Sequence, residues 1–313
     1  MMDFRVRSLL FCCLLLGLSR FAAATCSAEA QLAVQVLGSG GPELNDGRAS
    51  SGYLIWRGDR AVVLVDSGSG SLANFETSGA QVNDLQAVLF THFHVDHSAD
   101  FPALIKGSFF TGRDTDLPVY GPAGNELMPG AKEFVAGLFG QKGIYRYLAG
   151  FLVNDRAGAY RIRVTEVPLS PHEIHRYTVG DLRLSAVPVQ HGPVAAVAWR
   201  VDIDGCSMAF SGDLNNSFGT LTRLAKAADL LVANNAIRED SAGVARFLHM
   251  PPSEIGKIAA AADVSSLILS HRMLRTLGRE QETKRQIQRF YAGPLHFADD
   301  LDRFPVPELL QDP

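Results

Sequence analysis

The amino-acid sequence predicts a domain of mixed α-helices and β-strands. Short apolar runs of strand length are interspersed with stretches of helical periodicity. Histidines and aspartates follow directly after several of these runs, where functional sites in layered α/β folds collect. The chain has 313 residues, of which 47% are hydrophobic and 20% charged. This length and composition are ordinary for one large or two small globular domains.

The N-terminus has the pattern of a secretory signal peptide. Arg5 and Arg7 precede an apolar run, and three alanines ending at Ala24 supply small residues for cleavage. The run is short for a membrane span, which needs about 20 residues, so an uncleaved anchor is the weaker alternative. We therefore predict a signal peptide over 1–24 and a mature domain over 25–313 without a membrane span. The expected location is secreted or periplasmic.

Cleavage after Ala24 leaves two cysteines, Cys26 and Cys206. They can pair in an oxidising compartment, and a plain half-buried thiol at Cys206 is the alternative. The formal net charge of the whole chain is −4, and the leader carries three arginines and one aspartate, so its loss makes the protein more acidic. Because nucleic-acid affinity depends on Lys and Arg, this balance argues against nucleic acid as a partner.

In the first half, hydrophobic periodicity and turn residues place the elements. The expected strands are 32–37, 52–56, 61–65, 87–90 and 117–122, and the expected helices are 100–110 and 125–139. The segment 140–159, rich in Gly, Phe and Tyr, is interpreted as a lid or substrate-facing insertion, with connecting packing as the alternative.

The second half is expected to contain another run of strands with alternating patterning. The expected strands are 161–167, 183–189, 194–201, 207–210, 229–233 and 267–269, and the expected helices are 252–262 and 280–291.

The strongest chemical signal is His92-x-His94-x-Asp96-His97, which follows the apolar run 87–90. Imidazole and carboxylate groups together suit a divalent first-row metal. Residues two apart on an extended segment point the same way, so His92 and His94 can bind one ion, while the turn directs Asp96 and His97 to a second. A surface cluster of histidines is the alternative. A structural zinc site is disfavoured, because no cysteine lies near this stretch.

This motif resembles the metal-binding motif of the metallo-β-lactamase superfamily of hydrolases. The flanking pattern is most similar to the branch that contains tRNase Z, the secreted arylsulfatases and related phosphodiesterases, from about Leu32 to the C-terminus. The resemblance implies an α+β fold, the αβ/βα sandwich, in which two mixed sheets pack face to face with helices outside. It also implies two divalent metal ions, Zn²⁺ first, with Mn²⁺ or Fe²⁺ as alternatives.

When the metal ligands of the family are matched to this sequence residue by residue, each ion receives ligands from both halves of the chain. One ion is expected on His92, His94 and His191, the other on Asp96, His97 and His271, with Asp213 bridging both. Asp66, which follows the strand 61–65, is expected either to support this site or to cap a short helix.

The expected chemistry is hydrolysis by a hydroxide held between the two ions. Asp96 is expected to accept a proton from the water. His249 is expected to donate a hydrogen bond or proton to the oxyanion, with a satisfied loop histidine as the alternative. His172, His175 and His296 are expected at the surface.

One departure from the tRNase Z pattern limits the carry-over. Those proteins have a His-Glu pair after the strand equivalent to 230–233, where this chain has Asn234-Asn235. Together with the leader and the charge, this favours a small-molecule ester, either a phosphodiester or a sulfate ester. A lactonase or thioesterase and a non-catalytic metal-binding module are the alternatives, and assembly into a homo-oligomer is left open.

Overall fold

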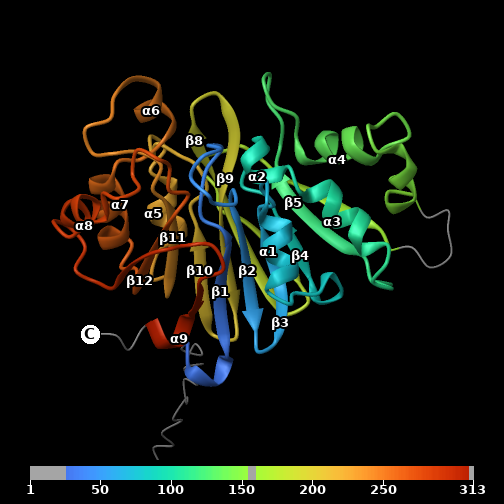
Figure 1. Ribbon diagram of the computed structural model, residues 1–313, viewed down its shortest axis with the longest axis horizontal. Coiled ribbons are helices and arrows are strands. Elements are labelled where there is room, and N and C mark those ends of the chain that lie inside the picture. Colours follow the sequence, from blue (N-terminus) through green and yellow to red (C-terminus); the bar gives the residue numbers. More distant parts are fainter. Residues whose placement is uncertain (1–25, 154–159, 310–313) are drawn as a thin grey trace, which may run out of the picture.

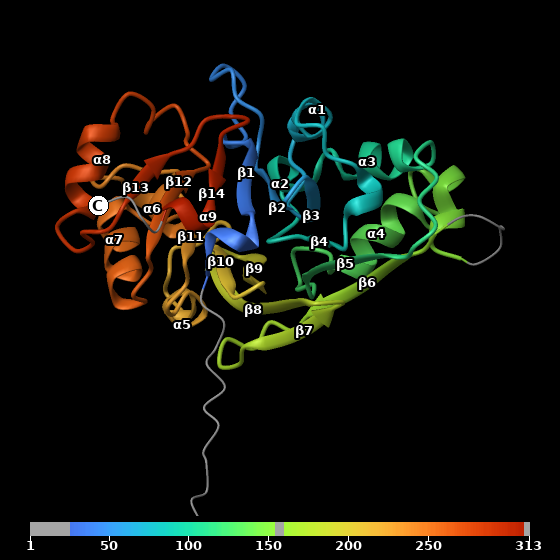
Figure 2. The same cartoon turned by 90° about the horizontal axis from the view of Figure 1, so that it is seen from below.

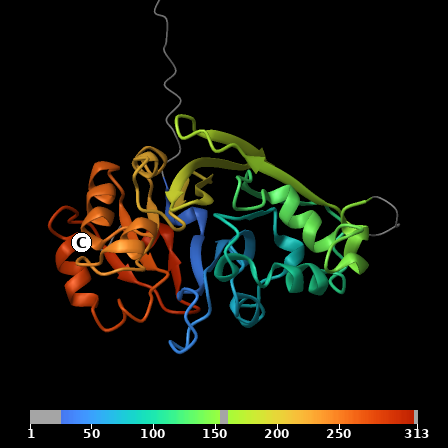
Figure 3. The same cartoon turned by 90° about the horizontal axis from the view of Figure 1, so that it is seen from above.

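The structure, a computed structural model, describes residues 26–153 and 160–309, so the predicted signal peptide lies outside the described residues. Two seven-stranded sheets face each other, and helices cover their outer faces (Figures 1 and 2). The predicted αβ/βα sandwich is therefore confirmed. Seen from above in Figure 3, the two halves of the chain lie side by side, one in blue to green and the other in yellow to red.

The first sheet is formed by the first six strands of the chain and by β14, which lies near the C-terminus. Its order is β14-β1-β2-β3-β4-β5-β6, and β3 to β6 run parallel. These strands are β1 (Leu32–Gly38), β2 (Gly52–Arg57), β3 (Arg60–Val65), β4 (Ala87–Leu89), β5 (Leu117–Pro122), β6 (Ile162–Val167) and β14 (Arg303–Pro305). The helices of this half are α1 (Ser71–Thr77), α2 (Val95–Ser98), α3 (Phe101–Ser108) and α4 (Ala131–Phe139).

The second sheet has the order β13-β12-β11-β10-β9-β8-β7. Its strands are β7 (His175–Val179), β8 (Leu182–His191), β9 (Val194–Ile203), β10 (Cys206–Phe210), β11 (Leu230–Asn234), β12 (Ser266–Ser270) and β13 (Leu295–Phe297). The helices of the second half of the chain are α5 (Thr220–Leu224), α6 (Gly243–Leu248), α7 (Pro252–Ala261), α8 (Glu280–Ile287) and α9 (Val306–Leu309).

The core forms three apolar layers, because alternate strand residues point to opposite faces of a sheet. In β1, Val34 and Val36 belong to the layer between the sheets, whereas Ala33 and Leu37 belong to the layer under the first set of helices. Trp199 lies in the central layer and donates a hydrogen bond from Nε1 to the Phe90 carbonyl over 2.9 Å. This bond joins β9 to Phe90, two residues before the metal motif, so packing of the two sheets positions that motif.

Several element predictions need correction. The helix expected over 125–139 begins only at Ala131, because Pro129-Gly130 interrupts it and Asn125 Oδ1 instead accepts the Leu127 and Met128 backbone N–H groups. The helix expected over 100–110 ends at Ser108. Strands β7, β13 and β14 and helices α5, α6 and α9 were not expected, since all are short or lack a strong apolar period.

The segment 140–159 does not form the expected lid in its described part, 140–153. A 3₁₀ helix, Arg146–Phe151, buries Leu148 and Phe151 in the apolar layer around α3 and α4. The Phe151 ring lies 4.9 Å from the Tyr160 ring. In Figure 1 this segment lies on the right, beyond α4, whereas the β8–β9 hairpin and α6 lie to the left of α2. Connecting packing, the alternative, is what these residues do.

Cys26 and Cys206 form a disulfide that connects the start of the described chain to β10, across 180 residues of sequence. Reduction, or Cys26→Ser, is expected to lower the free energy of unfolding by about 2–4 kcal/mol, because a crosslink over a long loop restricts the unfolded chain. Thermal melting with and without reductant measures this. A Cys26→Ser variant that melts like the oxidised wild type would contradict the expected contribution.

Candidate metal centre

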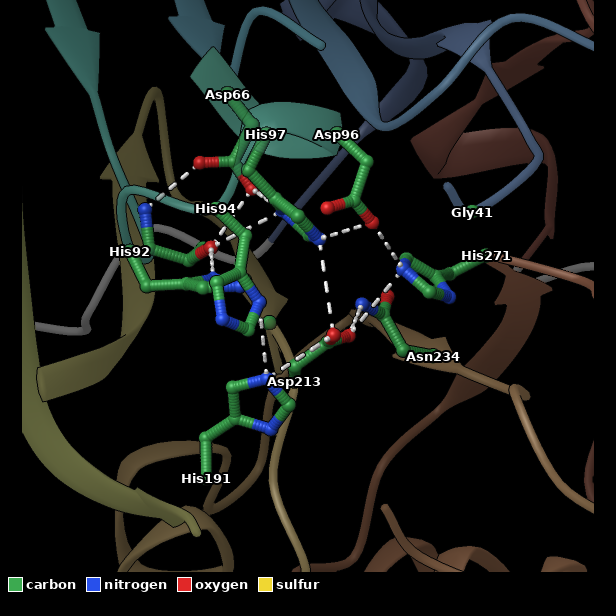
Figure 4. Close-up of polar contacts among 12 residues, drawn as sticks. Gly41, Asp66, His92, His94, Asp96, His97, His191, Asp213, Asn234 and His271 are labelled. Atoms are coloured by element: carbon green, nitrogen blue, oxygen red, sulfur yellow. Dashed lines mark hydrogen bonds and ion pairs between the residues drawn. The ribbon is translucent and has the colours of Figure 1, made fainter. Parts of the chain in front are cut away.

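The seven residues predicted as metal ligands lie together at one edge of the sandwich (Figure 4). They follow four strands whose C-terminal ends share that edge, since β8 and β10 both pair antiparallel with β9, and β10, β11 and β12 run parallel. The motif follows β4, and the other three lie at or just after the ends of β8, β10 and β12. The strand layout therefore gathers residues that are far apart in the sequence.

The seven side chains fall into two groups, in each of which one potential ligand atom per residue lies within 4.8 Å of the others. The first group is His92, His94, His191 and Asp213, and the second is Asp96, His97 and His271. His191 Nε2 lies 3.4 Å from His94 Nδ1 in the first group. His271 Nε2 lies 3.2 Å from Asp96 Oδ2 in the second. Six of the seven side chains are buried, and His94 is half-buried.

Asp213 lies between the two groups. Its Oδ2 is 3.6 Å from His191 Nε2, and its Oδ1 is 3.6 Å from His271 Nε2. Although burial raises the pKa of Asp213, the nearby histidines, His271 and His249 first, hold that pKa well below its usual range. An ionised carboxylate with one oxygen toward each group has the arrangement that a bridging ligand needs.

A hydrogen-bond network behind the second group fixes the motif. Asp66 follows β3 with a left-handed φ of 57° and accepts the Thr91 backbone N–H at 2.7 Å and the Thr91 hydroxyl at 2.8 Å. His97 Nδ1 lies 2.7 Å from Asp66 Oδ2. This contact orients the ring so that Nε2 points toward Asp96 and Asp213 (Figure 4). Asp66 thus supports the motif, which is one of the two roles expected for it from the sequence.

The residues fit divalent cations. Within the described residues, His92 Nε2 and His97 Nε2 are buried and have no hydrogen-bond partner. An unpaired buried imidazole nitrogen is costly, and coordination to a cation satisfies it. Neutral imidazoles with carboxylates are the donor set that zinc and related first-row metals prefer.

The pKa values of the free side chains reflect their crowding. Burial raises the pKa of Asp96, but His97 and His271 lower it by more, so that the pKa is about 2. Burial lowers the pKa of His97, but the carboxylates of Asp66 and Asp96 raise it to about 9. Burial lowers the pKa of His92 well below 6.5, and neighbouring histidines lower it further. Near neutral pH, Asp96 is therefore ionised and His92 is neutral, the forms in which each donates electrons to a metal.

Two further side chains approach Asp213. Asn234, the last residue of β11, donates a hydrogen bond from Nδ2 to Asp213 Oδ1 over 2.6 Å, a contact that sequence reasoning missed. His249 follows α6 and is buried, with Nδ1 3.8 Å from Asp213 Oδ2. The carbonyl of the preceding residue, Leu248, lies 2.9 Å from His191 Nδ1. The C-terminal end of α6 thus positions His249 and also orients the His191 ring.

The remaining histidines lie apart from this centre. His172 is exposed, as expected. His175 at the start of β7 and His296 in β13 are half-buried rather than on the open surface, and the His296 ring lies 5.7 Å from the Phe304 ring.

The chain is similar over most of its length to enzymes named Ribonuclease Z. Ribonuclease Z of Mycobacterium bovis (strain BCG / Pasteur 1173P2) is 28% identical over 298 residues, 88% of this chain and 98% of that protein. Ribonuclease Z of Mycobacterium sp. (strain KMS) is 30% identical over 295 residues, 87% of this chain and 95% of that protein.

Two solved structures share the fold. Human tRNase Z, short form, has a TM-score of 0.65 at 17% identity, covering 88% of this chain and 99% of that one. The metallo-β-lactamase fold protein YhfI from Bacillus subtilis has a TM-score of 0.64 at 23% identity, covering 87% and 98%. At these identities the likeness shows the fold alone.

These comparisons correct two predictions. The argument against nucleic acid as a partner is wrong, because relatives that match along nearly their whole length are named as ribonucleases. The prediction of a secreted or periplasmic protein is contradicted by the same relatives. In the part of the chain that the structure describes, no helix is long and apolar enough to cross a membrane.

The family itself is shown by a domain match and by the fold. The β-lactamase superfamily domain matches residues 62–272, more than half of the chain, a range that includes all seven residues of the two groups. The paired sheets, with the histidines and aspartates at one edge, agree with it. The chain belongs to the metallo-β-lactamase superfamily of hydrolases.

Proposed function

We propose that this protein is a dinuclear metal-dependent phosphodiesterase that cleaves RNA. The observation that carries the proposal is the pair of adjacent His/Asp groups with Asp213 between them. Similarity to ribonucleases Z along nearly their whole length supports a phosphodiester in nucleic acid as the bond that is cleaved.

In this proposal the two groups are the two metal sites. His92, His94 and His191 would hold one ion, Asp96, His97 and His271 the other, and Asp213 both. When bound, two divalent ions, Zn²⁺ or alternatively Mn²⁺ or Fe²⁺, supply a nucleophilic water of lowered pKa and positive charge beside the attacked phosphorus.

The chain's own side chains then handle protons and charge. Asp96 is ionised near neutral pH, so its carboxylate can accept the proton that leaves the attacking water. Burial lowers the pKa of His249 to about 4, against the opposing effect of Asp213, so its imidazole is neutral near pH 7. A neutral imidazole donates one N–H hydrogen bond, and we assign this donor to the oxyanion that develops on the leaving oxygen.

Asn234 is assigned as a positioning residue that acts through Asp213. Its amide holds Asp213 Oδ1 at 2.6 Å and so fixes which oxygen faces which group. Asn234→Ala is expected to weaken metal binding by about 10- to 100-fold, the usual effect of losing a hydrogen bond to a ligating side chain. Titration of metal-free protein by calorimetry measures this. The control is Asn83→Ala, since Asn83 is an exposed amide far from the centre that contacts Thr111.

The proposed reaction is tested with purified, metal-loaded protein on four substrates. These are RNA with a 3′ extension, bis(p-nitrophenyl) phosphate, an aryl sulfate and a lactone. Cleavage of both phosphodiesters that stops on chelation and returns with metal supports the proposal. A protein that holds two metals and hydrolyses only the aryl sulfate or only the lactone would refute it and identify a different ester as the substrate.

A further inference from the structure

A cavity of about 730 Å³ opens beside the second His/Asp group, and Asp96 forms part of its lining. Most of the lining comes from the loop between β1 and β2, residues 39–51. This loop touches the metal centre: a Cβ on Gly41 would lie 2.9 Å from the His271 ring (Figure 4). The volume is that of a small-molecule site. The cavity therefore lies where a group attached to the reacting phosphate would extend.

Hydrogen bonds and an ion pair to the segment after β13 fix the conformation of this loop. Asp300 accepts hydrogen bonds from the Ser39 backbone N–H at 2.8 Å and from the Ala49 backbone N–H at 2.7 Å, so it fastens both ends of the loop. Arg48 donates to Ser39 Oγ at 2.6 Å and pairs with Asp299 at 2.6 Å. These contacts span about 250 residues of sequence, from the loop to the segment after β13. The wall of the cavity is thus formed before a ligand arrives.

The lining combines apolar and acceptor groups. Leu44 and Val95 are 86% and 74% exposed, although both are aliphatic. Glu43 adds a carboxylate that the Leu274 backbone N–H orients over 2.5 Å. Asp46 also lines the cavity, but its Oδ1 accepts the Arg48 backbone N–H at 3.1 Å and its Oδ2 is buried. Exposed apolar side chains beside a hydrogen-bond acceptor suit a planar ring that carries an exocyclic amino group.

Beyond the metal centre, the lining offers little to a phosphate chain. Glu43, Asp46 and Asp300 are carboxylates, and Asp96 is assigned to a metal ion. Among the described residues that line the cavity, Arg48 is the one cation, and its guanidinium is already paired with Asp299. A polyphosphate backbone needs Lys and Arg, so it finds no partner here, whereas a nucleobase with amino groups does.

We infer that this cavity binds the nucleoside next to the scissile phosphodiester, with its base against Leu44 and Val95, and that Glu43 selects a base with an amino group. The inference rests on the proposed phosphodiesterase function and adds a substrate preference to it. Adenine, cytosine and guanine carry amino groups and uracil does not, so uridine is the poorest of the four nucleosides.

The test uses the 5′-(p-nitrophenyl) phosphodiesters of the four nucleosides, each compared with bis(p-nitrophenyl) phosphate. For metal-loaded wild type, kcat/KM is expected to be at least about fivefold higher for the adenosine, cytidine and guanosine esters than for the uridine ester. Leu44→Ala is expected to lower kcat/KM for all four nucleoside esters about fivefold relative to the bis-aryl ester. Glu43→Gln is expected to reduce the difference in kcat/KM between the uridine ester and the other three esters.

Leu127→Ala is the matched control, since Leu127 is 61% exposed and does not line the cavity. Calorimetric binding of the four nucleoside 5′-monophosphates should follow the same order without turnover. If wild type cleaves bis(p-nitrophenyl) phosphate but ranks the four nucleosides equally, and Leu44→Ala leaves the ratio unchanged, the inference is wrong and the phosphodiesterase proposal stands. If no phosphodiester is cleaved, the proposed function is wrong as well.

Discussion

Asp213→Ala is expected to lose bound metal and hydrolysis together. Its two oxygens lie 3.6 Å from His191 and from His271, so one carboxylate serves both groups. Without it, each group keeps three side chains, and the first group consists of histidines alone. We expect fewer than two metals per chain and a fall in kcat/KM of more than about 10³-fold, because the activated water depends on both ions. Elemental analysis and the bis(p-nitrophenyl) phosphate assay measure the two effects.

The control for this variant is Asp59→Ala, which removes an exposed carboxylate in the β2–β3 turn. It should keep two metals and full turnover. An Asp213→Ala protein that retains both metals and loses only activity would show that Asp213 acts on protons rather than as a bridge.

His249→Ala is expected to separate metal binding from turnover. His249 lies 3.8 Å from Asp213, its Nδ1 has no hydrogen-bond partner within the described residues, and it belongs to neither ligand group. The variant should therefore keep two metals while kcat falls about 10²- to 10³-fold, the usual effect of losing one donor to a developing oxyanion. The loss should shrink for esters with very good leaving groups, which need little help from a proton donor.

The matched control is His172→Ala, since His172 is exposed and lies outside the centre. Its metal content and kcat should equal those of wild type. If metal content of His249→Ala falls in step with activity, His249 is a ligand, and the assignment of Asp96, His97 and His271 to the second ion must be redrawn.

The location of the site followed from local sequence because each key residue comes directly after an apolar strand. His191 ends β8, and Asp213 and His271 follow β10 and β12, so one edge of the sheet gathers them. Residue type then indicates the chemistry, since buried imidazole and carboxylate groups in one place suit divalent metals. The prediction that two sheets pack face to face came from the family resemblance rather than from the strand patterns.

Other features depended on contacts that no local pattern records. Asn234 reads as the end of a strand, and only the approach of β11 to β10 brings its amide to Asp213. The loop 39–51 reads as a Gly-rich turn, and its rigidity comes from Asp299 and Asp300, about 250 residues away. The wrong inference about nucleic acid came from net charge, which is a sum over the whole chain and does not describe any single surface.

The two ligand groups draw on residues that leave the ribosome at different times. The motif supplies His92, His94, Asp96 and His97 early, whereas Asp213 and His271 lie in the second sheet. A nascent chain that ends before residue 213 lacks both Asp213 and His271, and one that ends between residues 213 and 271 still lacks His271. In either case the site is incomplete and binds metal more weakly. Tight binding of both metals therefore requires synthesis to pass residue 271, after which the second half of the chain can fold against the first.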